Sequence, residues 1–395
     1  MDQKRPRTGL IVLISASIMA AVLGSIHAFS VFLAPLEAEF GVTRSQVSLT
    51  YSLALVTLTI AVMIGPKVFS RWSAHMVMFR VGTLAAGGAF LAGHAPSFSI
   101  ILIGYSLIFG AANGLGYGFG LQIAAKYNSS REGLAMGIVT AAYALGAVVS
   151  SPLFSLALNR GGFSVAMFAL AAVLLTSGVL CAGLMRSRGV RLDSDTHAFR
   201  RVSSAKRSLS LLWLGYFGGV LAGLMIIGHA AAVSEALRPD LHTWIAPMII
   251  ATFNVVGSLG VGRLSDRFSP RILMSALGVL TVFALAGIAV NGRIFGLLFG
   301  LAAVGFAYGG TITVYPAAIL KLFGRQESPR VYGLVFTAWG LAGLTGPWLA
   351  GRLFDLNGSY TLALLVAACF ACLSAATVII LFRDKSLRRE PKVDG

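Results

Sequence analysis

The most informative part of the chain is a short polar segment, which reads Gly262-Arg263-Leu264-Ser265-Asp266-Arg267-Phe268-Ser269-Pro270-Arg271. It separates two apolar runs, roughly 243–262 and 272–291. Each run is about as long as the ~20 residues that a helix needs to cross a bilayer. Arginines concentrate in the cytoplasmic loops of membrane proteins. The segment therefore predicts a cytoplasmic turn between two membrane-spanning helices.

The composition extends this interpretation to the whole chain. Of the 395 residues, 57% are hydrophobic and 11% are charged, and the mean hydropathy is +0.83. A soluble domain has about 25% charged residues, and a disordered chain is more polar still. The three cysteines lie in apolar runs, so a disulfide scaffold is also excluded. These values predict a multi-pass membrane protein.

Twelve apolar runs are long enough to span a membrane. They lie at roughly 10–34, 45–65, 76–94, 99–123, 133–157, 164–185, 208–233, 243–262, 272–291, 294–318, 332–351 and 359–382. The length of these runs, and not any strand-like alternation, predicts an all-α membrane fold with twelve transmembrane helices.

The basic residues predict the orientation. If the N-terminus is cytoplasmic, the 31 Lys and Arg residues fall on cytoplasmic segments with five exceptions, Arg44, Arg160, Arg238, Arg293 and Arg352. An odd number of spans would place the two basic ends of the chain on opposite sides of the membrane and would spoil this distribution of Lys and Arg. Both termini are therefore expected in the cytoplasm. The net charge of +17 is clustered between apolar runs, which indicates membrane topology and predicts no nucleic-acid partner.

One long polar stretch, residues 186–207, divides the chain into two halves. We expect an N-terminal six-helix bundle over 1–185, a cytoplasmic linker over 186–207 and a C-terminal six-helix bundle over 208–395. The two halves also resemble each other, because Tyr143 in the fifth run corresponds to Trp339 in the eleventh. Such a six-plus-six repeat is a feature of one large class of transporters.

Two motifs make the resemblance more specific. The segment 262–271 resembles the G-x-L-x-D-R-x-x-x-R loop of the major facilitator superfamily. Together with Gly114-Leu115-Gly116-Tyr117 and Asn254-Val255-Val256-Gly257, the chain resembles the oxalate/formate antiporter and monocarboxylate porter families. This resemblance implies the major facilitator fold, a monomer, and transport of small organic anions by alternating access.

The chain departs from these families at two positions. Many relatives carry an Arg directly after N-x-x-G, where this chain has Ser258, and the oxalate carriers have a Lys where this chain has Trp339. Both fixed cations are missing, so the dianion oxalate is not the expected substrate.

The resemblance implies a gate at the polar loop. A carboxylate at a helix end can cap the N-terminus of another helix, where backbone N–H groups carry partial positive charge. We expect Asp266 to dock near the start of the fifth span when the transporter faces outward. The expected gating residues are Gly262, Asp266, Arg267, Arg271, Arg131 and Glu132.

The resemblance also implies that spans 1, 4, 7 and 10 face the transport cavity. Polar residues that lie one helical turn apart share a face of their helix. Hydrogen bonding between helices, with no part in transport, is the alternative role for each of them. The expected substrate-binding residues are His27, Asn113, Tyr117, Tyr143, His229, Asn254, Ser258, Tyr308, Thr311, Tyr315 and Trp339.

Two histidines are candidates for proton coupling, because no Asp, Glu, Lys or Arg lies in the middle of an apolar run. His27 and His229 lie in the first and seventh runs, and packing without a transport role is the alternative for each. An anion beside a protonated imidazole would stabilise that proton, and by reciprocity the proton would strengthen binding of the anion.

These observations predict a secondary active transporter for a small organic solute. We expect a monocarboxylate-type anion, coupled to protons or to exchange, in a multi-pass protein of a bacterial inner membrane. Efflux of an amphipathic neutral compound is the alternative, and a transporter-like receptor is less favoured. The sequence offers no nucleophile with a paired base, no metal cluster and no phosphate loop. No enzyme activity, cofactor or metal is therefore predicted.

Overall fold

The structure is a computed structural model that describes residues 4–69, 71–187, 190, 206–290 and 293–383. Its described part consists of helices and short turns, with no strand. This agrees with the all-α class predicted from the apolar runs. The linker expected over 186–207 lies largely outside the described residues.

The first half of the chain forms a series of helices. They are α1 (Lys4–Leu23), the 3₁₀-helix η1 (Gly24–Phe32), α2 (Leu33–Phe40), α3 (Arg44–Phe69), α4 (Ala74–Gly93), α5 (Phe98–Ile101), the π-helix η2 (Leu102–Phe109), α6 (Gly110–Tyr127), the 3₁₀-helix η3 (Ser129–Arg131) and α7 (Glu132–Arg186). The segments α1, η1 and α2 follow one another without a loop and make up the first span, as α5, η2 and α6 make up the fourth.

The second half has the same general plan. Its helices are α8 (Lys206–Ile227), α9 (Ala230–Leu237), α10 (Ile245–Leu264), α11 (Pro270–Val290), α12 (Ile294–Asn357) and α13 (Thr361–Arg383). The segments α8 and α9 are separated only by Gly228 and His229, and together they correspond to the seventh run.

Two helices are too long for a single crossing. At 1.5 Å per residue, α7 with 55 residues and α12 with 64 residues would be roughly 80 and 100 Å long, against a hydrocarbon core of about 30 Å. Each is broken by glycine: Gly162 has φ of 74° and Gly324 has φ of 71°, a conformation that favours glycine. Within the described part of the chain, ten helices are long and apolar enough to span a membrane. Dividing α7 and α12 at these breaks accounts for the twelve expected spans.

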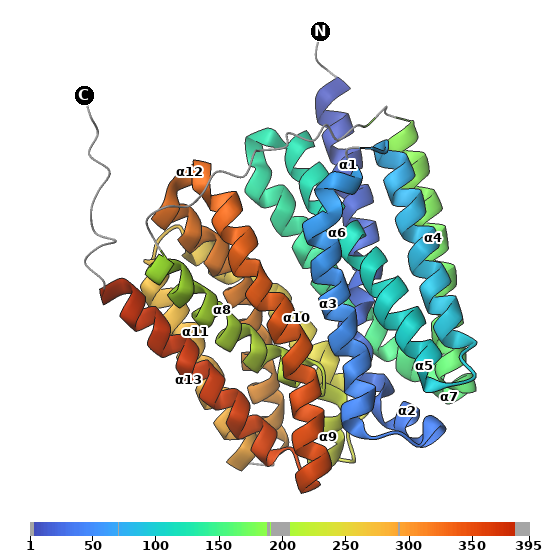
Figure 1. The fold of residues 1–395 in the computed structure, drawn as a ribbon, viewed down its shortest axis with the longest axis vertical. Coiled ribbons are helices and arrows are strands. Elements are labelled where there is room, and N and C mark those ends of the chain that lie inside the picture. The colour runs from blue at the N-terminus through green and yellow to red at the C-terminus, as the bar shows by residue number, and fades with distance from the viewer. Residues whose placement is uncertain (1–3, 70, 188–189, 191–205, 291–292, 384–395) are drawn as a thin grey trace.

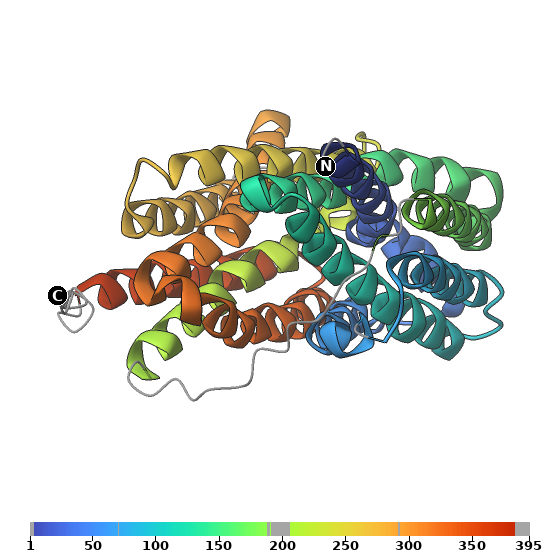
Figure 2. The same cartoon turned by 90° about the horizontal axis from the view of Figure 1, so that it is seen from above.

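The helices gather into two bundles (Figures 1 and 2). In the first, α7 packs against α1 and α4, and α6 packs against α3. In the second, α12 packs against α8 and α10, and α13 packs against α8 and α11. Helix α1 begins at the upper side of Figure 1. We call this side the terminal face and the opposite side, where α2 and α9 lie, the outer face.

Close helix crossings in both bundles depend on glycine. A methyl group on Gly114 of α6 would lie 2.1 Å from the backbone oxygen of Leu58 on α3. A methyl group on Gly309 of α12 would lie 2.1 Å from the backbone oxygen of Asn254 on α10. Small residues let helix backbones approach in a membrane. The fourth span therefore crosses the second as the tenth crosses the eighth, which is the pattern of a repeat.

Two interruptions lie at related places in the repeat. His27 falls within the 3₁₀ segment η1 of the first span. His229 falls at the break between α8 and α9, where its N–H bonds to the Ile226 oxygen three residues earlier. Mid-helix 3₁₀ stretches often mark functional hinges. The two histidines therefore lie at irregular points of the first and seventh spans.

Candidate functional site

A cavity with a volume of about 130 Å³ lies between the two bundles. This is room for on the order of ten waters, or for one small organic molecule. Helices of both bundles contribute. The lining residues are His27, Leu58, Val62, Tyr117, Leu121, Thr140, Tyr143 and Ala144 from the first bundle, and Asn254, Ser258, Tyr308, Ile312, Tyr332, Phe336 and Trp339 from the second.

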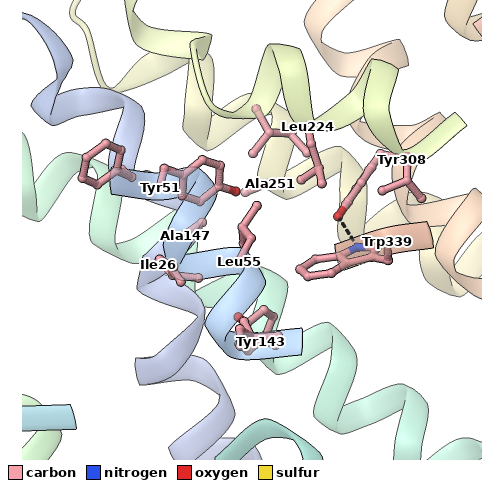
Figure 3. Packing of buried hydrophobic residues seen from close by; sticks show 14 of the residues in the cluster. Ile26, Tyr51, Leu55, Tyr143, Ala147, Leu224, Ala251, Tyr308 and Trp339 are labelled. Carbon is pink, nitrogen blue, oxygen red and sulfur yellow. Dashed lines mark hydrogen bonds between the residues drawn. The ribbon is translucent and has the colours of Figure 1, made fainter. Parts of the chain in front are cut away.

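Aromatic rings form much of the wall. Tyr117 and Tyr143 have ring centroids 4.5 Å apart, and Phe336 stacks on Trp339 at 5.5 Å. Figure 3 shows Tyr143 of α7 on one side and the pair Tyr308 and Trp339 of α12 on the other. The ring faces suit an apolar or planar solute, while the hydroxyl and N–H groups provide polar contacts.

Several polar groups of the wall already have partners. Tyr143 donates its hydroxyl hydrogen to Asn113 Oδ1 at 2.9 Å, and Asn113 Nδ2 donates to the Leu23 oxygen at 2.7 Å. Tyr117 and Thr140 hydroxyls are 3.2 Å apart. Asn113 thus lies behind Tyr143 and orients it. These bonds hold the wall of the cavity in place.

Tyr308 and Asn254 keep a hydrogen to donate, and His27 does so in one of its two tautomers. Trp339 Nε1 donates to the Tyr308 hydroxyl oxygen at 3.0 Å, and since indole can only donate, the Tyr308 hydrogen remains available. The Ser258 hydroxyl can donate its hydrogen to the Gly309 oxygen at 3.2 Å or to Asn254 Oδ1 at 3.3 Å, and neither bond uses the Asn254 amide N–H groups. His27 Nδ1 lies 2.6 Å from the buried Tyr51 hydroxyl. If Tyr51 donates to this nitrogen, the hydrogen of His27 lies on Nε2.

The cavity has no fixed charge. Among the described residues that line it there is no Asp, Glu, Lys or Arg. Its polar groups are therefore neutral donors around a largely apolar space. Such a site favours a solute that brings hydrogen-bond acceptors of its own.

The two bundles are in close contact on the outer side of the cavity. A methyl group on Gly343 of α12 would lie 2.8 Å from Leu55 Cβ on α3, and one on Gly351 would lie 2.9 Å from Ser45 Cα. Trp348 donates its backbone N–H to Ser52 Oγ at 3.1 Å. The glycine-rich part of α12 therefore packs across the bundle interface and closes the outer face.

The expected gating residues lie away from this closure, near the terminal face. Asp266, Arg267, Arg271, Arg131 and Glu132 are exposed, and Gly262 is half-buried. The loop is tied to the second bundle by Lys321, whose Nζ donates to the Ser265 oxygen at 2.6 Å.

The cavity brings together many of the expected substrate-binding residues but not all of them. His27, Tyr117, Tyr143, Asn254, Ser258, Tyr308 and Trp339 line it, and Asn113 supports it. Thr311 and Tyr315 do not line it: Tyr315 packs on Tyr216 inside the second bundle, with ring centroids 4.6 Å apart. His229 is buried near the outer face, where its Nε2 lies 2.8 Å from the Pro347 oxygen.

Sequence reasoning missed part of the wall. Tyr332 and Phe336 line the cavity beside Trp339, on the same helix. Their positions are i, i+4 and i+7, so they share one face. This spacing could have identified them. Thr140 carries no comparable signal, because it precedes Tyr143 in an Ala-rich stretch.

The chain is similar in sequence to several known transporters. The chain is 27% identical to the uncharacterized MFS-type transporter YhjX of Escherichia coli over 86% of each chain. It is 27% identical to rat monocarboxylate transporter 13 over 94% of this chain and 89% of that one. It is also 23% identical to the oxalate:formate antiporter of Oxalobacter formigenes, over 93% and 90%.

The fold has counterparts among solved structures. A bacterial homolog of the human lysosomal transporter Spinster, crystallised in an inward-facing, unoccupied conformation, superposes with a TM-score of 0.76 at 13% identity over the whole of both chains. The sequence profile of the Major Facilitator Superfamily matches residues 12–290 and 212–394. The chain therefore belongs to the Major Facilitator Superfamily, as a multi-pass membrane transporter and not an enzyme.

Proposed function

We propose that the chain transports a small monocarboxylate-type anion through the central cavity by alternating access. The observation that carries this proposal is the set of donors that Tyr308, Asn254 and, in its Nε2–H form, His27 offer in a cavity without acidic side chains. A carboxylate accepts such bonds, and charge-assisted hydrogen bonds are strong. Because no cationic side chain among the described residues lines the cavity, a substrate with one negative charge is favoured over a dianion. The named relatives, a monocarboxylate transporter and an oxalate:formate antiporter, point to the same class.

We further propose that both termini are cytoplasmic and that the membrane is a bacterial inner membrane. The positive-inside rule supports this orientation, and bacterial relatives such as YhjX support the location. The terminal face is then cytoplasmic. Because the outer face is closed by α3 and α12, the conformation corresponds to an inward-facing state of a monomer.

Proton coupling is assigned to His27 in this proposal. His27 lines the cavity, and its Nδ1 is held by Tyr51. A proton on this imidazole would be stabilised by a bound carboxylate, so anion and proton would bind together. Exchange of one anion for another, without a proton, remains the second mode of coupling.

The gate at the terminal face is assigned to the loop that carries Asp266. In the present conformation Asp266, Arg131 and Glu132 are exposed. Closure of this face would bring the loop toward the start of α7, where backbone N–H groups can donate hydrogen bonds to a carboxylate. Gly262, Arg267 and Arg271 complete the proposed gate.

Efflux of an amphipathic neutral compound is the second candidate function. The aromatic wall of Tyr332, Phe336 and Trp339 favours it, because rings bind apolar compounds without a counter-charge. In that case the same three donors would bind a carbonyl or hydroxyl oxygen.

Transport assays in proteoliposomes separate these functions. Formate, acetate, lactate and oxalate are tested against neutral aromatic compounds, with and without a pH gradient, and protein-free liposomes are the blank. We expect saturable uptake of a monocarboxylate that a pH gradient or an internal anion accelerates. Transport of neutral compounds alone would replace the first proposal by the second. Lack of transport of either class would contradict both.

A further inference from the structure

Six polar side chains join the two bundles at the outer face, and we call this group the outer latch. Its members are Glu37, Arg44 and Ser48 from the first bundle and His229, Asp355 and Tyr360 from the second. The turns beside it end in glycines with left-handed conformations: Gly41 follows α2 and Gly358 follows α12. The latch lies apart from the central cavity, and none of its members lines that cavity.

Arg44 is the centre of the latch. Its Nη2 donates to Glu37 Oε2 at 2.8 Å, its Nε also pairs with that carboxylate, and its Nη1 donates to the Tyr360 hydroxyl at 2.7 Å. The guanidinium lies over the Phe354 ring at 4.4 Å. Only 12% of the Arg44 side chain is exposed. The Arg44 guanidinium therefore pairs with Glu37 of its own bundle and donates to Tyr360 of the other bundle.

Asp355 makes a second link between the bundles. Its carboxylate accepts the backbone N–H groups of Arg44 at 3.1 Å and of Ser45 at 3.0 Å. These are the first residues of α3, so Asp355 caps a helix of the opposite bundle. Separation of the bundles at the outer face would leave the backbone N–H groups of Arg44 and Ser45 without this acceptor.

His229 is buried and has polar neighbours on both ring nitrogens. Nδ1 lies 3.0 Å from the Tyr360 hydroxyl, and Nε2 lies 2.8 Å from the Pro347 oxygen and 3.1 Å from Ser48 Oγ. The Pro347 carbonyl can only accept, so Nε2 must carry a hydrogen. Ser48 already donates to the Arg44 oxygen, so it too can accept from Nε2.

The direction of the remaining bond follows from Arg44. A guanidinium can only donate, so the Tyr360 oxygen accepts from Arg44 and its own hydrogen is free to point at His229 Nδ1. Burial raises the pKa of Tyr360, so this hydroxyl stays protonated. The chain of donors runs from Arg44 through Tyr360 and His229 to Pro347. It assigns the neutral Nε2–H form to His229.

A second proton on His229 does not fit this arrangement. It would sit on Nδ1 and face the Tyr360 hydroxyl, whose oxygen would then have to accept from both Arg44 and His229 while its own hydrogen loses His229 as an acceptor. The added charge would also lie near Arg44. The nearby carboxylates of Glu37 and Asp355 are already bonded to Arg44 and to the start of α3.

We propose that the outer latch is a proton-sensitive seal, which closes the outer face when His229 is neutral and releases it when His229 takes up a proton. His229 then acts as a positioning residue between the bundles and does not contact the transported solute. The proposal goes beyond the proposed function, and its test needs no substrate.

The seal can be tested by measuring the distance across the outer face. Spin labels are placed at Glu39→Cys and Asn357→Cys, two exposed positions on opposite bundles, in a background of Cys369→Ala and Cys372→Ala. Distances are recorded in detergent micelles at pH 7.5 and pH 5.5, where both faces meet the same pH. With an ordinary histidine pKa of about 6.5 in the open state, the open-to-closed ratio should rise about tenfold at pH 5.5.

Matched variants attribute this response to the latch. His229→Gln should abolish the pH response, whereas His242→Gln should retain it, because exposed His242 on the same face stacks only on Trp244 of its own loop. Tyr360→Phe is a second variant, and it should raise the open fraction at pH 7.5 and reduce the pH response. Size-exclusion profiles confirm that each variant is folded. An unchanged distance between the two pH values, or a His229→Gln variant that responds like the parent, would overturn the proposal.

Discussion

The glycine-lined contact between α3 and α12 leads to a quantitative prediction for Gly351→Ala. The new methyl group would lie 2.8 Å from Ser48 Oγ, 2.9 Å from Ser45 Cα and 3.0 Å from the Arg44 oxygen. Carbon atoms in favourable contact are about 3.5–4.0 Å apart, so α3 must move away. Overpacking of this kind costs about 1–3 kcal/mol. The cost applies only while the outer face is closed.

The expected result is a shift of the conformational equilibrium toward the outward-open state. A difference of 1–3 kcal/mol corresponds to roughly a 5- to 150-fold change in the ratio of the two states. Spin labels at Ser129→Cys and Glu327→Cys, exposed positions at the terminal face of each bundle, measure the opposite movement. Their separation should decrease in Gly351→Ala. The background is again Cys369→Ala and Cys372→Ala.

The matched control is Gly333→Ala on the same helix, where a methyl group meets nothing within 4 Å. It should leave the distance distribution unchanged. If Gly351→Ala and Gly333→Ala give the same distribution as the parent, the contact between α3 and α12 does not limit outward opening and the reasoning is refuted.

Three further predictions concern the cavity and the gate. Tyr308→Phe removes a free donor and leaves the Trp339 N–H without its acceptor, a loss of about 1–3 kcal/mol that should raise the KM for uptake about tenfold or more. His27→Gln removes the proposed proton site, so uptake in proteoliposomes should lose its dependence on a pH gradient. Asp266→Asn should slow transport at an unchanged yield of folded protein, because an amide caps a closing helix less strongly than a carboxylate.

Each of these variants has a matched control in the chain. Tyr315→Phe makes the same change on α12 outside the cavity, and His242→Gln changes a histidine of an outer loop. Asp240→Asn removes a carboxylate that pairs with Arg238 of its own loop, which holds the pKa of Asp240 below its usual range. A control that behaves like its partner variant would contradict the corresponding assignment.

The fold was largely predictable from the sequence, because membrane spans are marked by length and hydropathy alone. The two longest helices are an instructive case. Separate apolar runs at 133–157 and 164–185 indicated two spans, and the structure joins them as α7 with a break at Gly162. The 3₁₀ segment around His27 and the π-helix of the fourth span were not predictable. Neither segment contains a proline, and the single glycine in each, Gly24 and Gly104, is too common in this chain to mark an irregular segment.

The site was predictable only in part. Spacing along a helix places Tyr308 and Tyr315 on one face, yet Tyr315 packs against Tyr216 inside its bundle. Because the helices are tilted, the same face of a helix borders the cavity at one end and the interior of its bundle at the other. Arg44 was recognised only as a basic residue on the outer side. Its bond to Tyr360 joins residues more than 300 positions apart, and no local pattern contains that information.

The uncharged lining of the cavity has an electrical consequence. When the binding site carries no charged side chain, the transporter without a bound solute can change between its two conformations without moving charge through the membrane field. Moving one elementary charge across 100 mV involves about 2.3 kcal/mol. A monovalent anion crossing alone would therefore make turnover voltage-dependent, whereas an anion accompanied by a proton would cross electrically silent. A current recorded on a supported membrane distinguishes an anion that crosses alone from an anion that crosses with a proton.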